Sequence, residues 1–155
     1  MRILPDVNPA EFEAPHANSF ALPQGLIGFQ GYTRAELLYQ PEQLPFLWLK
    51  LQGPTDSIYF IVVEPAGVVP GYDPELFDQD AAGLELSGSA DALVLNIVSL
   101  KNMNPMEATV NLVGPIIVNR RTKIARQLVV ANYSRYSAHF QLVDSRTPAA
   151  SAACA

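Results

Sequence analysis

The sequence predicts a small, mostly β protein of a single domain with at most short helices. Its 155 residues suit one domain, and 49% apolar against 16% charged residues is a composition typical of a globular fold. Thirteen prolines leave little room for long helices. Short runs with strand character, separated by Gly, Pro and Asn, indicate a barrel or a sandwich.

Four strands are expected in the first half of the chain. The run at 58–63 is an unbroken series of β-branched and aromatic residues, which fits a strand covered on both faces. Trp48 lies among apolar neighbours, so we expect it in the core. The four expected strands span 20–22, 34–39, 46–51 and 57–64.

The second half combines one polar segment with further strands. Asp73 is a good helix cap and Pro74 a good first helical residue, so we expect a short helix or a turn-rich loop within 73–86. The strands that follow are expected at 92–100, 108–113, 115–118 and 125–132, with a bend at the Gly-Pro pair 114–115.

Nothing in the sequence indicates a membrane or an oxidising compartment. The chain does not begin with a signal-peptide pattern, and its apolar runs are shorter than the ~18 residues of a membrane span. Cys154, the only cysteine, lies in a small, polar tail that we expect to be disordered, so no disulfide framework is expected. We therefore expect a cytoplasmic protein without a membrane partner.

Catalytic and cofactor-binding patterns are thin. The two histidines, His16 and His139, lie where surface or partly packed side chains are expected. Two histidines and one tail cysteine cannot build a zinc site of ordinary spacing. The run GLIGFQG at 25–31 lacks the Lys and Ser/Thr of a phosphate loop and is interpreted as a turn. We expect no cofactor and no enzymatic activity.

The charge pattern favours a protein partner. A net charge of −5 argues against nucleic acid, whose phosphates need clustered Lys and Arg, and suits a basic protein. Within 73–86 the acidic residues have no Lys or Arg among them, so this segment is either a solvated face or a docking patch, with Tyr72 and Phe77 as apolar anchors. The acidic residues are Asp73, Glu75, Asp78, Asp80 and Glu85.

A basic cluster follows the strand expected at 115–118. Edge protection of a sheet is its favoured interpretation, ahead of a second partner site. Because this cluster and the acidic segment are far apart in sequence, a polarised surface is expected. The cluster consists of Arg120, Arg121, Lys123 and Arg126.

The order of motifs resembles the FliW family of flagellar assembly factors. The most specific piece is ATVNLVGPIIVNRRTKIARQLVV at 108–130. The resemblance covers about 18–143, which leaves an N-terminal segment at 1–17 and a tail at 144–155 outside it. The other matching pieces are FALPQGLIGF (20–29), LPFLWLKLQ (44–52), IYFIVVEP (58–65), GYDPELFD (71–78) and LVLNIVSL (93–100).

The resemblance implies a partly open antiparallel β-barrel that binds proteins and is not an enzyme. Members of the family bind flagellin and the translational regulator CsrA, an RNA-binding dimer that represses flagellin translation. Free factor removes the regulator from the flagellin message, and flagellin captures the factor again. Carried over to this chain, the regulator surface falls on Tyr72, Asp73 and Glu75, with Asp78 and Asp80 beside them.

Alternatives remain for the flagellin site and for the function. We expect flagellin at a groove or edge near 111–119, although Asn111 and Asn119 flank a bend and favour turn closure over ligand contact. A small-ligand β-barrel would need a cavity, whereas the many Leu, Ile and Val residues favour a filled interior. An enzyme using the carboxylate pairs at 73/75 or 78/80 is least favoured.

Overall fold

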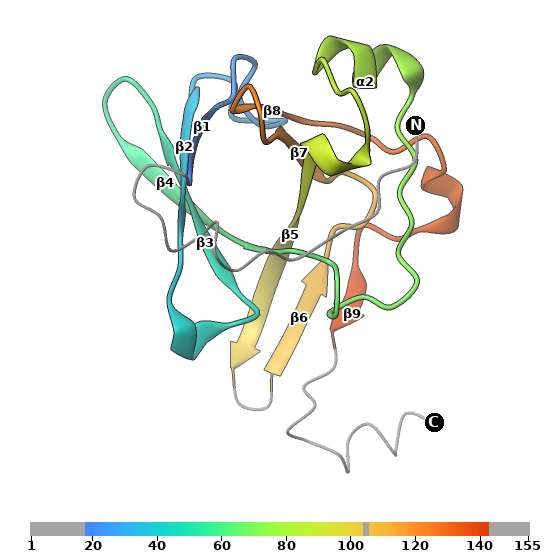
Figure 1. Cartoon of the computed structure of the whole chain (residues 1–155). Coiled ribbons are helices and arrows are strands. Elements are labelled where there is room, and N and C mark those ends of the chain that lie inside the picture. Colours follow the sequence, from blue (N-terminus) through green and yellow to red (C-terminus); the bar gives the residue numbers. More distant parts are fainter. Residues whose placement is uncertain (1–17, 104–105, 143–155) are drawn as a thin grey trace.

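A computed structural model describes residues 18–103 and 106–142 (Figure 1). The expected segment at 1–17 and the expected tail at 144–155, with His16 and Cys154, lie outside the described residues. The nine strands are β1 (Ser19–Ala21), β2 (Arg34–Leu38), β3 (Leu47–Gln52), β4 (Ser57–Val63), β5 (Ala92–Met103), β6 (Met106–Val110), β7 (Ile116–Asn119), β8 (Ile124–Gln127) and β9 (Phe140–Leu142).

Seven of these strands close into a barrel. The order of neighbours is β4-β3-β2-β1-β8-β7-β5, and β4 pairs with β5 to complete the ring. β6 and β9 continue the sheet beyond β5, outside the ring. All pairings are antiparallel except β1 with β8, which are parallel and joined at one residue pair, Ala21 with Ile124. The predicted mostly β, barrel-forming domain is confirmed.

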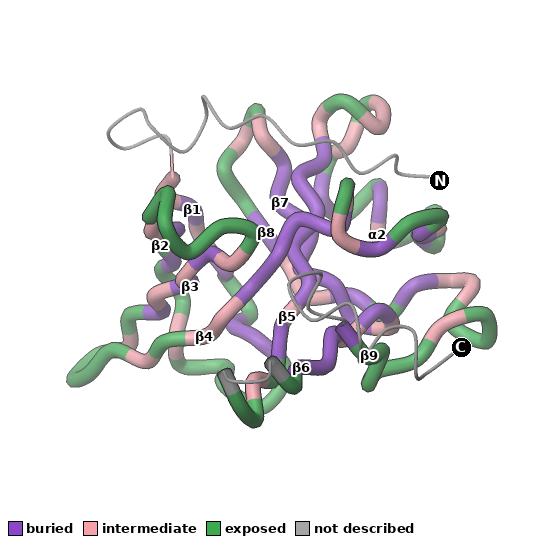
Figure 2. The backbone as a smooth tube through the Cα atoms, turned by 90° about the horizontal axis from the view of Figure 1, so that it is seen from below, coloured by how far each residue is buried: buried purple, intermediate pink, exposed green. Residues whose placement is uncertain are grey.

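β5 and β7 separate two hydrophobic cores, one on each face. Side chains alternate along a strand, so Leu93 and Leu95 face the barrel interior while Ala92 and Val94 face the opposite side. The core that contains Ala92 and Val94, outside the barrel interior, is called the second core. It is covered by the connection between β4 and β5 and by β9. Figure 2 shows the result as buried chain in β7 and in the first half of β5. The chain from 64 to 91 therefore has an apolar surface to pack against.

The short helix begins later than the sequence predicted. Helix α2 spans Asp78–Gly83 and is preceded by Phe77, whose side chain makes no cap hydrogen bond. Asp73 and Pro74 lie in an extended stretch instead, because hydrogen bonds to a neighbouring loop hold that stretch straight. Three 3-10 turns complete the fold: η1 (Pro41–Gln43), η2 (Ser89–Asp91) and η3 (Tyr133–Arg135).

Tertiary packing overturns several local expectations. The first half of β4 is not covered on both faces, since Tyr59 is 54% exposed. Trp48 lies on the outer, partly exposed face of β3, where its Nε1 donates a hydrogen bond to Oε1 of Gln43 at 2.8 Å. β8 ends at Gln127, and β9 was not expected.

Candidate protein-binding site

The acidic segment is fixed to the loop that carries η3. The backbone N–H of Asp73 donates to the hydroxyl of Tyr136 at 2.9 Å, and its carbonyl accepts from Nδ2 of Asn132 at 2.9 Å. The N–H of Glu75 donates to Oδ1 of Asn132 at 2.9 Å, and its carbonyl accepts from the N–H of Ala131 at 2.6 Å. Asn132 thus bridges both residues and holds this stretch in an extended conformation.

Tyr72 supports the segment from inside the protein and is not an exposed anchor, because its side chain is only 6% exposed. Its hydroxyl donates to the carbonyl of Leu112 at 2.7 Å and accepts from Nδ2 of Asn96 at 3.3 Å. Its ring packs edge-on against Tyr136, with 4.9 Å between centroids. Burial raises the pKa of Tyr72 to about 12, and the Asn96 hydrogen bond lowers it in part.

Phe77 has an exposed apolar neighbour that the sequence did not identify. Glu75 contacts Ala131 and Asp80 contacts Arg126, so the two stretches run antiparallel. Phe77 lies between Glu75 and Asp80, and Val129 lies between Arg126 and Ala131, so the two residues belong to the two stretches that meet at these contacts. The two side chains are 48% and 45% exposed. Two exposed apolar side chains thus lie between these two contacts.

Carboxylates and one further aromatic ring border this pair. Asp78 is exposed, Glu75 is half-buried, and Asp80 lies 3.4 Å from NH1 of Arg126. Tyr133, at the start of η3 and 55% exposed, follows Val129 along the same loop. We define the docking surface as Glu75, Phe77, Asp78, Asp80, Val129 and Tyr133.

The expected polarised surface is wrong, because the basic cluster folds against the acidic segment. Arg126 meets Asp80, and NH2 of Arg121 donates to the carbonyl of Glu85 at 2.8 Å. The turn between β7 and β8 packs beside the end of α2, which brings residues separated by some 40 positions together (Figure 1). The arginines therefore contribute to the position of the acidic segment.

Asn111 and Asn119 close turns, as the sequence favoured. Oδ1 of Asn111 accepts from the N–H groups of Val113 and Gly114 at 3.0 and 2.9 Å. Asn119 is fully buried, and its Oδ1 accepts from the N–H groups of Arg121 and Thr122 at 2.9 and 3.1 Å. Neither side chain is presented to a partner.

The expected flagellin edge near 111–119 is not available for strand addition. β7 is paired on both sides, with β5 and β8, and is buried throughout. The free side of β5 beyond Val98 carries an exposed Lys101 and a register shift between Leu100 and Asn102, features that discourage added strands. The edges of this sheet thus favour side-chain docking over strand addition.

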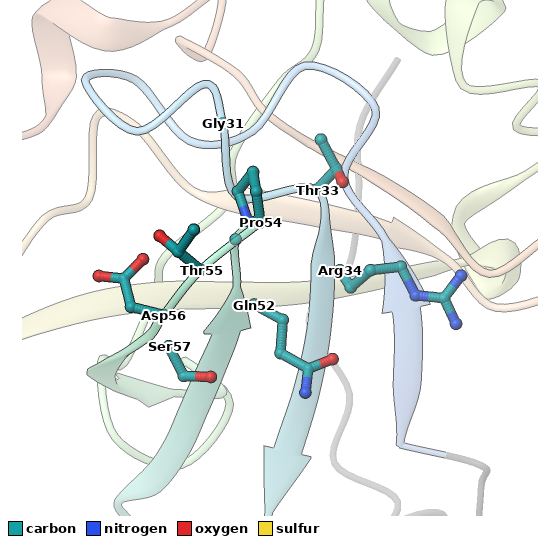
Figure 3. Close-up of a pocket in the computed structure, with 9 residues that line it drawn as sticks. Gly31, Thr33, Arg34, Gln52, Pro54, Thr55, Asp56 and Ser57 are labelled. Carbon is teal, nitrogen blue, oxygen red and sulfur yellow. The ribbon is translucent and has the colours of Figure 1, made fainter.

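The barrel interior is filled, which removes the basis for a small-ligand barrel. Interior residues such as Leu49, Leu51, Leu95 and Ile116 are inaccessible to solvent. A hollow of about 490 Å³ lies outside, between the start of β2 and the turn at 53–56, and its lining is mostly small and polar (Figure 3). The side chain of Arg34 points away from that turn. The lining contains no His, Cys or Lys.

The described residues contain neither a metal-binding cluster nor a membrane-spanning helix. Across residues 18–103 and 106–142, no group of three or more His, Cys, Asp or Glu side chains could hold a metal ion. In the same residues, the structure has no helix that is both long and apolar enough to cross a membrane.

Val129 and Tyr133 are the members of the docking surface that sequence reasoning missed. Val129 lies in the run Leu128-Val129-Val130, which was assigned to a strand. Its two neighbours are 3% and 0% exposed, so only the middle residue points outward. The sequence gives no signal of this alternation, because all three residues are apolar.

Comparisons with known proteins agree with the barrel architecture. The family model described as FliW protein matches residues 6–142, so the match begins within the segment 1–17, which was expected to lie outside the resemblance. The flagellar assembly factor FliW of Syntrophus aciditrophicus is 32% identical over 134 residues, 86% of this chain and 83% of that protein. The one of Geotalea uraniireducens is 34% identical over 121 residues, 77% and 72% of the respective chains.

A solved structure extends the agreement to three dimensions. A crystal structure of the flagellar assembly factor FliW matches with a TM-score of 0.69 at 25% identity, covering 86% of this chain and 91% of that chain. The sequence and the fold agree, and the chain belongs to the FliW family of flagellar assembly factors.

Proposed function

We propose that this flagellar assembly factor is a cytoplasmic, non-enzymatic regulator that binds CsrA through the docking surface and also binds flagellin. The proposal has two parts, CsrA binding (the CsrA arm) and flagellin binding (the flagellin arm). The observation that supports CsrA binding is that Phe77 and Val129 are exposed and have carboxylates near them. Apolar side chains exclude water at the centre of an interface, while bordering charges speed and orient the encounter. A basic, RNA-binding protein is the partner that this arrangement fits.

CsrA binding and flagellin binding would be linked, because the factor would exchange one partner for the other. Binding to CsrA relieves repression of flagellin translation, and accumulating flagellin then takes the factor back. If the regulator keeps its RNA surface free in the complex, the factor must favour a regulator state with weaker RNA affinity. Such a coupling is typically about 1–3 kcal/mol. The flagellin arm rests on family membership and has no assigned surface here.

Several features of the site support a binding role over catalysis. The carboxylates of the docking surface are partly or fully exposed and lie beside arginine or solvent. The described residues offer no histidine or nucleophile next to them. Acid–base catalysis needs a positioned pair facing a substrate pocket, whereas protein docking needs only an accessible, complementary surface.

Calorimetric titration of the host's CsrA into this protein tests the proposal. We expect a stoichiometric isotherm that weakens between low and moderate salt, because exposed charge pairs are screened. Glu75→Gln with Asp78→Asn should weaken binding at low salt by about tenfold and reduce the dependence on salt. Both changes keep side-chain size and remove charge only.

Glu42→Gln is the matched control, since Glu42 is an exposed acid on η1, at the far end of the barrel from α2 (Figure 1). The Glu42→Gln variant should bind CsrA with the same affinity as the native chain. Equal weakening by both sets of variants would show a general effect of net charge and reject the docking surface. A flat titration of the native chain at micromolar concentrations would reject the CsrA arm altogether.

A further inference from the structure

A prominent exposed apolar side chain lies on the loop between β1 and β2, outside the docking surface. Ile27 is 65% exposed, more than any other large hydrophobic residue in the described ranges. The residues around it, LPQGLIGFQG at 22–31, include no charged side chain. Single exposed apolar residues are common, so exposure alone assigns no role to Ile27.

The loop is tied to the end of β8 by one glutamine. The backbone N–H of Ile27 donates to Oε1 of Gln127 at 3.0 Å, and Nε2 of Gln127 donates to the carbonyl of Gly114 at 3.0 Å. Leu26, beside it, is 2% exposed and packs in the core of the barrel. Ile27 is therefore held outward while its neighbour points inward.

Turns and aromatic contacts fix the rest of the loop. Gly25 and Gly28 have φ angles of 64° and 88°, which glycine adopts without strain. The ring of Phe29 packs edge-on against Phe60, with centroids 5.3 Å apart, and the hydroxyl of Tyr32 hydrogen-bonds to the Asp56 carboxylate at 2.9 Å. The loop thus has its conformation before any partner arrives.

Gln127 also places this loop beside the docking surface. Val129 of the docking surface follows Gln127 by two residues, and Gln127 is the residue that holds the backbone of Ile27. The loop that carries Ile27 and the docking surface therefore share the stretch 127–129.

We propose that Ile27 is a second, uncharged anchor for the same basic protein partner that the docking surface binds; this inference rests on the proposed function. An anchor on a preformed loop loses little conformational entropy on binding, which favours its use in recognition. Its loop, 22–31, carries no charged residue, so we expect its contribution to affinity to be independent of salt. The carboxylates of the docking surface contribute mainly at low salt.

The experiment compares Ile27→Ala with the native chain in calorimetric titrations with CsrA at low and moderate salt. Loss of the side chain should weaken binding about tenfold at both salt concentrations, the size expected for an interface anchor. Leu44→Ala is the matched control, because Leu44 is an aliphatic residue 49% exposed beside η1, at the opposite end of the barrel. It should bind as the native chain does.

The outcomes separate this inference from the function on which it rests. If Glu75→Gln with Asp78→Asn weakens binding while Ile27→Ala does not, the docking surface stands and the second anchor is rejected. If the native chain fails to bind CsrA, both are rejected. Sedimentation of the chain alone tests another occupant: self-association that Ile27→Ala removes, with CsrA binding unchanged, would assign the loop to a second copy and overturn the inference.

Discussion

The side-chain amide of Asn119 donates to the backbone carbonyl of Leu84 at 2.7 Å and so joins the turn after β7 to the end of helix α2. A second bond from the same nitrogen reaches the carbonyl of Glu85 at 3.2 Å. These carbonyls lie at the end of the helix, where no further N–H group of the helix is available to donate a hydrogen bond. One buried side chain thereby positions the acidic segment against the barrel.

Asn119→Ala should lower the free energy of unfolding by about 3 kcal/mol, because it removes the buried hydrogen bond to the carbonyl of Leu84 and three part-buried ones. Asn111→Ala provides the comparison: Asn111 is half-buried and bonds two N–H groups, so about 1 kcal/mol is expected. Urea unfolding of both variants measures the difference. Equal losses would contradict the role assigned to Asn119.

Tyr72→Phe should cost about 1–2 kcal/mol at neutral pH, since the carbonyl of Leu112 loses its donor. The pKa of Tyr72 is raised from 10.0 to about 12, chiefly by burial. This raised pKa contributes stability that is complete below pH 10 and is lost as the pH rises to 12, a change of about 2–3 kcal/mol.

The stability advantage of the native protein over Tyr72→Phe should therefore shrink from pH 10 upward and vanish or reverse by pH 12. Unfolding measured at a series of alkaline pH values tests this. A constant difference would contradict the burial of an un-ionised hydroxyl. CsrA affinity at neutral pH should stay unchanged in Tyr72→Phe, because its side chain is not part of the docking surface.

Gly28→Ala and Gly31→Ala form a matched pair on the loop that carries Ile27. A methyl group at either position meets no atom within 4 Å, but Gly28 has φ at +88° and Gly31 has no positive φ. Gly28→Ala should lose about 1–2 kcal/mol of stability through backbone strain, and Gly31→Ala close to none. Thermal unfolding of the two variants measures this difference. Equal melting temperatures would argue against a fixed loop conformation.

The contact between Arg126 and Asp80 should contribute little to stability. The arginine side chain is 40% exposed and the nitrogen–oxygen distance is 3.4 Å, so solvent screens the pair. A double-mutant cycle with Arg126→Gln and Asp80→Asn should give a coupling below about 1 kcal/mol. A coupling of several kcal/mol would mean that this pair, and not Asn119, holds the acidic segment in place.

The sequence predicted most strands because their signals are local. Apolar runs between Gly and Pro residues located β3, β4, β5 and β7 to within a few residues. The sequence did not predict β9, because Phe140–Leu142 is three residues long and pairs, within the described residues, only with β6. Its strand conformation comes from a partner distant in sequence, which no local pattern reveals.

The site was harder to predict because its contacts join distant parts of the chain. Asp73 and Pro74 have the local pattern of a helix start, but bonds from Asn132 and Tyr136 impose an extended conformation. Tyr72 has the composition of a docking anchor and is buried instead by the second core. Both errors have the same cause: tertiary contacts override local preference.

The central claim is that Phe77 and Val129 form the apolar centre of a protein-docking surface. Calorimetric titration of CsrA into Phe77→Ala with Val129→Ala, at moderate salt and beside the Leu44→Ala control, tests it most directly. We expect the double variant to keep its melting temperature and lose at least tenfold in affinity, with the control unchanged. Native affinity in the double variant would contradict the claim.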